Sequence, residues 1–358
     1  MEKITRVARW IALAVPLTCV LQTTAAEELP IAPHLVLPVP ADVSNELQDF
    51  IRSKPVLSKA EHLQSLPRDE ASQQARAEEI EAQNITNAQG LAHLLSVDVE
   101  PDTINRVRVY RITPPQIDPL HEKHVFLHLH GGAYLFGRGM AGTPEGMMLA
   151  AATQMPVISV DYRMPPQQPF PAAVDDVVRV YQQMLKERPA QSIVMGGTSA
   201  GGGLALAVTH KLKQLGLALP GALYAGTPWS DLTKTGDSYY TQEGIDHRLV
   251  SYDGFLAHAA KLYAGDRELT DPLLSPVYGD FEDFPPTYLV SGTRDLFLSN
   301  TVRVHTKLRA AGREAELMVF EGMSHADYIA AIKTPELQLN LAELNEFLLK
   351  HLQSGITP

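Results

Sequence analysis

The chain has 358 residues, of which 45% are hydrophobic and 20% charged, and its formal net charge is -11. This length suits one large domain or two smaller ones, with ample apolar material for a buried core. The acidic balance provides no basic surface for nucleic-acid phosphates or anionic lipids, so we expect no nucleic-acid partner.

The first 26 residues have the pattern of a secretory signal peptide. Three basic residues come before an apolar run at 10–20, and small residues at 24–26 offer a cleavage site. Because the run is short for a membrane span, we predict cleavage, a periplasmic or secreted protein, and no stable membrane insertion afterwards. An uncleaved anchor is the alternative. The single cysteine, Cys19, would leave with this segment, so the mature chain would have neither disulfides nor cysteine metal ligands.

Residues 27–90 are expected to form an N-terminal helical region that packs over the rest of the chain. Four prolines within 27–40 predict an extended lead-in. Helical patterns follow at 45–52 and 71–82, and the region shows no strand signal.

Residues 91–358 alternate between strand and helix patterns. Strands are predicted at 107–112, 124–129, 156–160, 192–195, 222–225, 287–290 and 316–320, and helices at 175–185, 204–208, 296–310 and 335–351. This alternation predicts an α/β fold, a mostly parallel sheet with helices on both faces. An aromatic-rich stretch at about 230–271 has no clear strand, and we expect it to be a helical insertion over the functional site.

A glycine-flanked serine, Ser199, follows the predicted strand at 192–195 and precedes the helix at 204–208. The segment Gly197–Gly201 is a G-x-S-x-G sequence in a strand–turn–helix context, the arrangement that exposes a nucleophilic serine on a strained turn. A Cβ at either glycine would collide with neighbouring backbone in so tight a bend. A glycine-rich loop with an incidental serine is the alternative.

A serine hydroxyl needs a base, and the base needs an acid that orients it. His325 follows the strand at 316–320, and Asp295 follows the strand at 287–290, so both emerge at the edge where Ser199 lies. The chain order Ser, Asp, His is the order of the α/β arrangement. Asp295 could also cap the helix that follows it. Asp271 and Asp327 are weaker candidates for the acid.

The turn at His130-Gly131-Gly132-Ala133, after the strand at 124–129, supplies candidate oxyanion donors. Glycines there let backbone N–H groups approach a tetrahedral oxyanion, together with the N–H of Ala200. Without the serine motif, the tripeptide His130-Gly131-Gly132 would be an ordinary turn.

With these segments, residues 90–352 resemble the hormone-sensitive-lipase-like branch of the α/β-hydrolases. The resemblance also uses Asp161-Tyr162-Arg163 and the segment Pro169–Ala173. It implies an eight-stranded sheet, a helical cap and hydrolysis of short-chain acyl esters. It further implies that Gly131, Gly132 and Ala200 bind the oxyanion and that His130 shapes their loop. Thr198 groups the chain with members that have threonine before the serine.

A second glycine motif, Gly137–Gly142, matches G-x-G-x-x-G, with Asp161 near the spacing of a ribose contact. A dinucleotide site needs those glycines to close the turn directly after a strand, and His130–Gly132 already occupy that turn. We therefore expect no nucleotide cofactor. The chain has no H-E-x-x-H or similar ligand spacing, so we expect no metal.

These features together predict a serine carboxylesterase that hydrolyses short- to medium-chain acyl esters through an acyl-enzyme, with Ser199, Asp295 and His325 as catalytic residues. Its partner is expected to be a small-molecule ester, and a homodimer is left open. A lactonase, amidase or acyltransferase could use the same residues. A non-catalytic binding protein is the alternative of a different class.

Overall fold

The computed structural model describes residues 37–55, 57–66 and 70–352, all but Leu37 within one compact unit. The predicted signal peptide lies outside the described residues, as does most of the proline-rich lead-in. Among the residues described, no helix combines the length and apolar character that crossing a membrane requires.

Eight strands form one sheet in the order β1-β2-β4-β3-β5-β6-β7-β8. The strands are β1 (Asp98–Ile104), β2 (Val107–Thr113), β3 (Val125–Leu129), β4 (Val157–Val160), β5 (Ile193–Thr198), β6 (Ala222–Gly226), β7 (Thr287–Gly292) and β8 (Ala315–Phe320). The pairs from β4 to β8 are parallel, and β2 is antiparallel to both of its neighbours. The predicted α/β class with a mostly parallel, eight-stranded sheet is confirmed.

The α-helices are α1 (Asn45–Arg52), α2 (Lys59–Ser65), α3 (Glu70–Leu95), α4 (Pro144–Thr153), α5 (Ala172–Met184), α6 (Ala200–Gln214), α7 (Ser238–Thr241), α8 (Ala257–Ala264), α9 (Leu298–Ala310), α10 (Asp327–Ala330) and α11 (Pro335–His351). The described part of the chain also contains short 3-10 segments and one π segment, Tyr252–Leu256.

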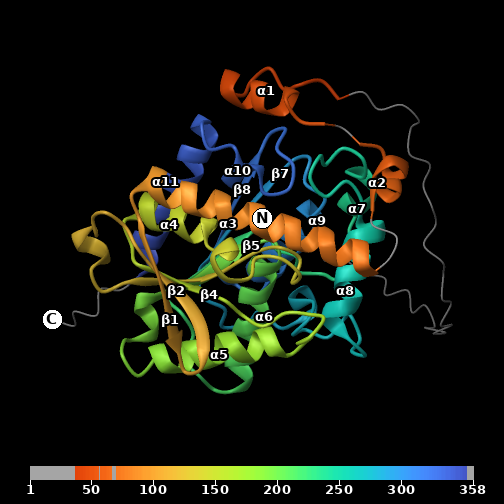
Figure 1. Cartoon of the computed structure of the whole chain (residues 1–358). Helices are drawn as coiled ribbons and strands as arrows, with labels where there is room; N and C mark the ends of the chain where they lie inside the picture. The colour runs from red at the N-terminus through yellow and green to blue at the C-terminus, as the bar shows by residue number, and fades with distance from the viewer. Residues whose placement is uncertain (1–36, 56, 67–69, 353–358) are drawn as a thin grey trace, which may run out of the picture. The chain divides into compact units, whose positions relative to one another are not determined.

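Two apolar cores lie on the two faces of the sheet. One joins the sheet to α5, α6 and α9 through Val177, Leu204 and Val304, and the other joins it to α4 and α11 through Met147 and Phe347. The strands β3 to β6 are buried on both faces, which accounts for their continuous apolar runs. Figure 1 shows α3 crossing the molecule on the side of α4.

Strand β1 and helix α4 are among the elements that were not predicted from the sequence, as are the short helices α2 and α10. The edge strand β1 is mostly exposed and contains Pro101, and it forms because it pairs with β2 along its whole length. Helix α4 packs against both α3 and α11, and it is apolar nearly all round. It therefore lacks the amphipathic period by which a helix is recognised in a sequence.

The parallel strands bring four loops to one edge of the sheet. These loops follow β3, β5, β7 and β8, and they carry Gly131, Ser199, Asp295 and His325 respectively. The carboxyl edge of a parallel sheet is where ligand sites of open α/β folds occur.

Candidate active site

Ser199 lies on a sharp turn between β5 and α6, with φ 62° and ψ -122°. A non-glycine residue with positive φ is strained, and surrounding contacts must hold it there. The Ser199 N–H donates to Gly226 O at 2.8 Å, and Ser199 O accepts from Trp229 N at 2.9 Å. These bonds fix the turn against the loop after β6.

The two glycines of the turn are required by the backbone of β3. A Cβ added to Gly197 would lie 1.8 Å from Leu129 O, and one added to Gly201 would lie 1.9 Å from the same oxygen. No side chain fits at such distances. The predicted reason for both glycines is therefore confirmed.

His325 and Asp295 form a buried pair. The Nδ1 of His325 lies 3.1 Å from Oδ1 of Asp295, and both side chains are almost fully buried. The Thr227 hydroxyl donates to Oδ2 of Asp295, and Ser291 Oγ donates to the same oxygen at 3.0 Å. With Nδ1–H donating to the carboxylate, the Nε2 of His325 is left as the basic nitrogen.

Phe297 fixes the other side of the imidazole. Its ring meets that of His325 edge to face, with centroids 4.9 Å apart. The N–H of Phe297 donates to Oδ1 of Asp295 at 2.7 Å, so Asp295 closes an Asx turn just before α9. The N-cap position of α9 belongs to Phe297, so Asp295 does not cap that helix.

The glycine loop after β3 lies against the serine turn. A Cβ on Gly131 would lie 3.0 Å from Thr198 O and 3.5 Å from the Cβ of Ser199. Gly132 has φ +103°, and a Cβ there would meet Phe136 O at 2.4 Å. Ala200 is the first residue of α6, and the first amides of a helix have no acceptor within it. Gly131 and Ala200, from two different loops, therefore both adjoin Ser199.

His130 supports the glycine loop from beneath. Its ring stacks on Tyr162 with centroids 4.1 Å apart, and the Tyr162 hydroxyl donates to His130 O at 2.6 Å. Burial lowers the pKa of His130 to about 4, against the opposing effect of its hydrogen bond to Gly131 O. The ring is therefore neutral at pH 7 and acts as a packing group for the loop.

A cavity of about 1120 Å³ opens above these loops. Ser199, His325, Gly131 and Gly132 line its floor, while Asp295 and Ala200 are fully buried. Its walls are mainly apolar and come from α3, from the inserted segment and from the chain around α10, with Ile80, Leu91, Leu94, Leu249, Phe255, Leu256, Ile329 and Ile332.

Glu145, which the sequence reasoning missed, also lines this cavity. Its carboxylate accepts the backbone N–H of Thr198 at 3.1 Å and the Thr198 hydroxyl at 2.5 Å. The Thr198 hydroxyl also contacts the hydroxyls of Tyr224 and Tyr328, and burial raises the pKa of both phenols well above the ordinary value. Glu145 therefore holds the residue that precedes Ser199.

The second glycine motif has a structural role. Gly137 N donates to Glu81 of α3 at 2.8 Å, and Gly139 N donates to Asp161 at 2.9 Å. Glu81 also accepts from Arg138 N at 3.2 Å. These contacts tie the loop to α3 and to the end of β4.

The weaker acid candidates lie outside the pair. Asp327 accepts from His247 Nε2 at 3.0 Å and from Ser324 N at 2.8 Å. Burial favours a higher pKa for Asp327, but the bond from His247 and the charge of Arg248 hold it below its ordinary value. Asp271 accepts from Leu273 N within its own turn.

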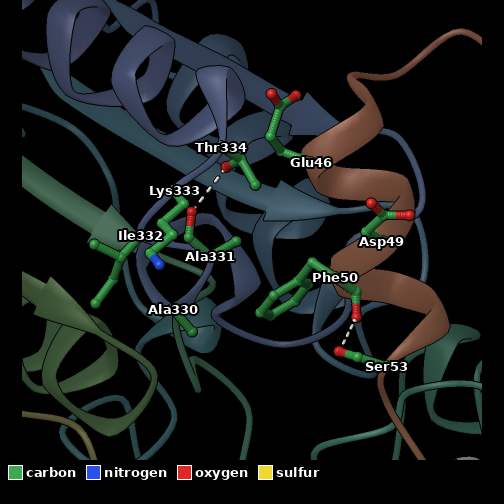
Figure 2. Close-up of a pocket in the computed structure, with 9 residues that line it drawn as sticks. All are labelled: Glu46, Asp49, Phe50, Ser53, Ala330, Ala331, Ile332, Lys333 and Thr334. Atoms are coloured by element: carbon green, nitrogen blue, oxygen red, sulfur yellow. Dashed lines mark hydrogen bonds between the residues drawn. The ribbon is translucent and has the colours of Figure 1, made fainter.

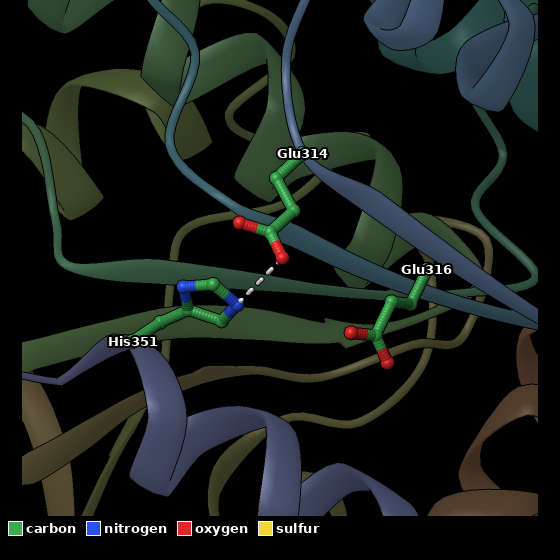
Figure 3. A group of neighbouring side chains, drawn as sticks. All are labelled: Glu314, Glu316 and His351. Carbon is green, nitrogen blue, oxygen red and sulfur yellow. Dashed lines mark ion pairs between the residues drawn. The ribbon is translucent and has the colours of Figure 1, made fainter.

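A second groove and a group of three side chains lie outside this site. The groove lies between α1 and residues 330–334, and its volume is about 390 Å³. Figure 2 shows the residues that line it, which include carboxylates but no serine–histidine pair. Figure 3 shows Glu314, Glu316 and His351 close enough to share a cation. Lys350 already lies 2.6 Å from Glu314 and 3.5 Å from Glu316, so an ammonium group compensates these carboxylates.

Comparison with known proteins agrees with the fold and the loop arrangement. Residues 126–329 match a family described as having the alpha/beta hydrolase fold. An esterase of Acinetobacter venetianus is 32% identical over 227 residues, 62% of this chain and 74% of its own length. The chain therefore belongs to the α/β-hydrolase family.

Similar solved structures include esterases of this fold. A crystal structure of the esterase E25 superposes with a TM-score of 0.87 at 46% identity, covering 91% of this chain and 99% of its own. An esterase of the bacterial hormone-sensitive lipase family superposes with a TM-score of 0.74 at 29% identity, covering 87% and 99%. The protein is a carboxylesterase of the hormone-sensitive-lipase-like type.

Proposed function

We propose that Ser199 attacks the carbonyl carbon of a carboxylic ester while His325 removes its proton. The tetrahedral oxyanion accepts hydrogen bonds from the N–H groups of Gly131, Gly132 and Ala200. His325 then protonates the departing alcohol, which leaves an acyl-enzyme on Ser199. Water, activated by His325, attacks the acyl group and releases the acid. Asp295 orients the imidazole throughout and stabilises its cation.

One observation carries this proposal: Ser199, His325 and the glycine loop line the floor of one cavity, and a buried Asp295 bonds the imidazole from behind. Replacement of Ser199 by alanine tests the role of this serine. We expect the rate of p-nitrophenyl butyrate hydrolysis to fall by about 10⁴-fold or more, with the fold intact. Retained hydrolysis by the purified variant would refute it.

We propose short- to medium-chain acyl esters as substrates. The cavity is comparable in size to pockets that hold small ligands, and its walls are largely apolar. A series of p-nitrophenyl esters from acetate to palmitate should give the highest kcat/KM among the shorter chains. Assays with a lactone, an amide and an alcohol acceptor separate ester hydrolysis from the related reactions.

We also propose that the protein is periplasmic or secreted, on the basic, apolar and small-residue pattern of residues 1–26. Expression of the full chain in a bacterium, followed by N-terminal sequencing of the periplasmic protein, should show a new terminus near Glu27. Recovery of the intact chain from the cytoplasm would contradict this.

A further inference from the structure

A second carboxylate, that of Asp246, lies buried beside the acid–base pair. It belongs to the inserted segment, and four backbone N–H groups converge on it. Its Oδ1 accepts from Arg248 N at 2.8 Å and Leu249 N at 3.0 Å, and its Oδ2 accepts from Leu296 N at 2.8 Å and His325 N at 3.3 Å. Both oxygens therefore act as acceptors.

The two bonds on Oδ2 reach the two loops that carry the pair. Leu296 directly follows Asp295 in the loop after β7, and His325 lies in the loop after β8. The carboxylate of Asp246 thus bridges the backbone on either side of the contact between the imidazole and Asp295. The two bonds on Oδ1 fold the inserted segment around the same carboxylate, so the insertion and both loops share one anchor.

The charge of Asp246 also bears on the imidazole. Burial and then the neighbouring charge of Asp295 raise the pKa of Asp246, and the charge of His325 opposes them. A carboxylate that receives four N–H groups is stabilised in its ionised form. In that form it places a second negative charge near the imidazole, which becomes a cation in both steps of the reaction.

The nearby carboxylate of Asp327 differs from that of Asp246, because side chains donate to it. Asp327 lies two residues after His325, and its carboxylate accepts hydrogen bonds from the side chains of His247 and Arg248. Among the described residues, the hydrogen bonds to Asp246 all come from backbone N–H groups, and the charges of Asp295 and His325 affect its pKa.

We propose that Asp246 is a positioning residue through which the inserted segment holds His325 and Asp295 in register and stabilises the imidazolium formed during catalysis. This inference rests on the proposed roles of Ser199, His325 and Asp295. It gives the insertion a part in the chemistry in addition to lining the cavity. Nothing in the sequence motifs points to Asp246, because its partners lie 50 and 79 residues away.

The substitution Asp246→Asn in the full chain tests the proposal. An asparagine has one acceptor oxygen and one NH₂ group, so two of the four N–H groups lose their acceptor and the negative charge is lost. A misplaced base costs up to about 10²-fold in rate. We expect kcat for p-nitrophenyl butyrate to fall by about 10- to 100-fold, with KM changed by less than about twofold.

The pH dependence of kcat/KM distinguishes a direct effect of Asp246 on the imidazole from a general loss of stability. Loss of the negative charge makes protonation of the imidazole less favourable, so the acid limb of kcat/KM should move to lower pH. Asp231→Asn is the matched control. Asp231 is equally buried and pairs with Arg303 on the side of the insertion, but it makes no contact with the pair. This variant should lose thermal stability without moving the acid limb.

The outcomes are distinct. A kcat within twofold of wild type for Asp246→Asn, or an acid limb as unmoved as in Asp231→Asn, overturns the inference. If Asp246→Asn does not fold, Asp246→Glu replaces it. The glutamate keeps the negative charge, so kcat should fall while the acid limb of kcat/KM stays in place. A shifted acid limb in Asp246→Glu overturns the inference. Ser199→Ala, assayed in parallel, tests the proposed function alone: its inactivity beside a fully active Asp246→Asn refutes only the role of Asp246.

Discussion

The carboxylate of Glu145 holds Thr198, the residue directly before Ser199, through both the backbone N–H and the hydroxyl. His128 Nε2 lies 3.2 Å from the same carboxylate and forms the other side of this buried contact. The serine turn is therefore held by a polar network beneath it, in addition to the close packing of its glycines.

Replacement Glu145→Gln should weaken this network. Glutamine keeps only one acceptor oxygen and loses the charge, so the charge-assisted bonds to the Thr198 N–H and hydroxyl weaken, at a cost of about 1–3 kcal/mol in the free energy of unfolding. We expect a lower urea midpoint and a kcat reduced by about tenfold or more. Glu100→Gln, on the exposed edge strand, is the control and should change neither quantity. An unchanged midpoint for Glu145→Gln would show that the network adds nothing.

Replacement Gly201→Ala should prevent the serine turn from forming. The added Cβ would lie 1.9 Å from Leu129 O, a backbone atom of a central strand that cannot move aside. We expect insoluble protein, or soluble protein without esterase activity. Gly90→Ala is the matched change in α3, where a Cβ meets nothing within 4 Å, and it should raise the unfolding temperature because alanine favours a helix by about 1 kcal/mol. A soluble, active Gly201→Ala would contradict the packing described for the turn.

Replacement Asp295→Asn should slow turnover while preserving the fold. The amide can still bond Thr227, Ser291 or Phe297, but it carries no charge to stabilise the imidazolium. By analogy with serine hydrolases in general, kcat should fall by about 10³- to 10⁴-fold with little change in KM. Circular dichroism would check the fold, and steady-state kinetics with p-nitrophenyl butyrate would measure the effect. A loss below tenfold would assign the acid role to another residue.

Acidification should destabilise the protein through buried neutral histidines. Burial lowers the pKa of His210, which does not line the cavity, to about 4, and its Nε2–H donates to Pro276 O at 3.0 Å. The unfolded chain takes up this proton near pH 6.5, before the folded chain does, so the contribution of His210 to stability is present above pH 6.5 and is lost as pH falls towards 4.

We therefore expect the free energy of unfolding to fall between pH 7 and pH 4.5 by about 2–3 kcal/mol from this residue alone. His210→Gln should flatten the pH dependence by that amount in urea titrations at the two pH values. An equal slope in the variant and the wild type would show that His210 titrates normally.

Much of the fold could be predicted from periodicity. Helix α11 and the buried strands β3 to β7 have strong apolar patterns, and their ends match the prediction within one residue except that β5 and β7 extend two to three residues further. Strand β1 could not be predicted, because its polar sequence is a strand only through pairing with β2. The domain boundaries and the roles of the site residues stay predictions.

The candidate site was predictable where a local motif exists and not elsewhere. The loops of Ser199 and Gly131 have sequence patterns set by tight backbone contacts, which any such turn requires. Glu145 and Asp246 act through partners 53 and 79 residues away. A single carboxylate in a helix or a loop gives no sign of such a contact until the chain is folded.

In the proposed mechanism His325 activates Ser199 as the nucleophile. Mass-spectrometric mapping of the protein after reaction with a fluorophosphonate tests this activation. We expect one adduct, on Ser199, formed at least about 10³-fold more slowly in His325→Ala. An adduct on a different serine, or equally fast labelling without the imidazole, would contradict it.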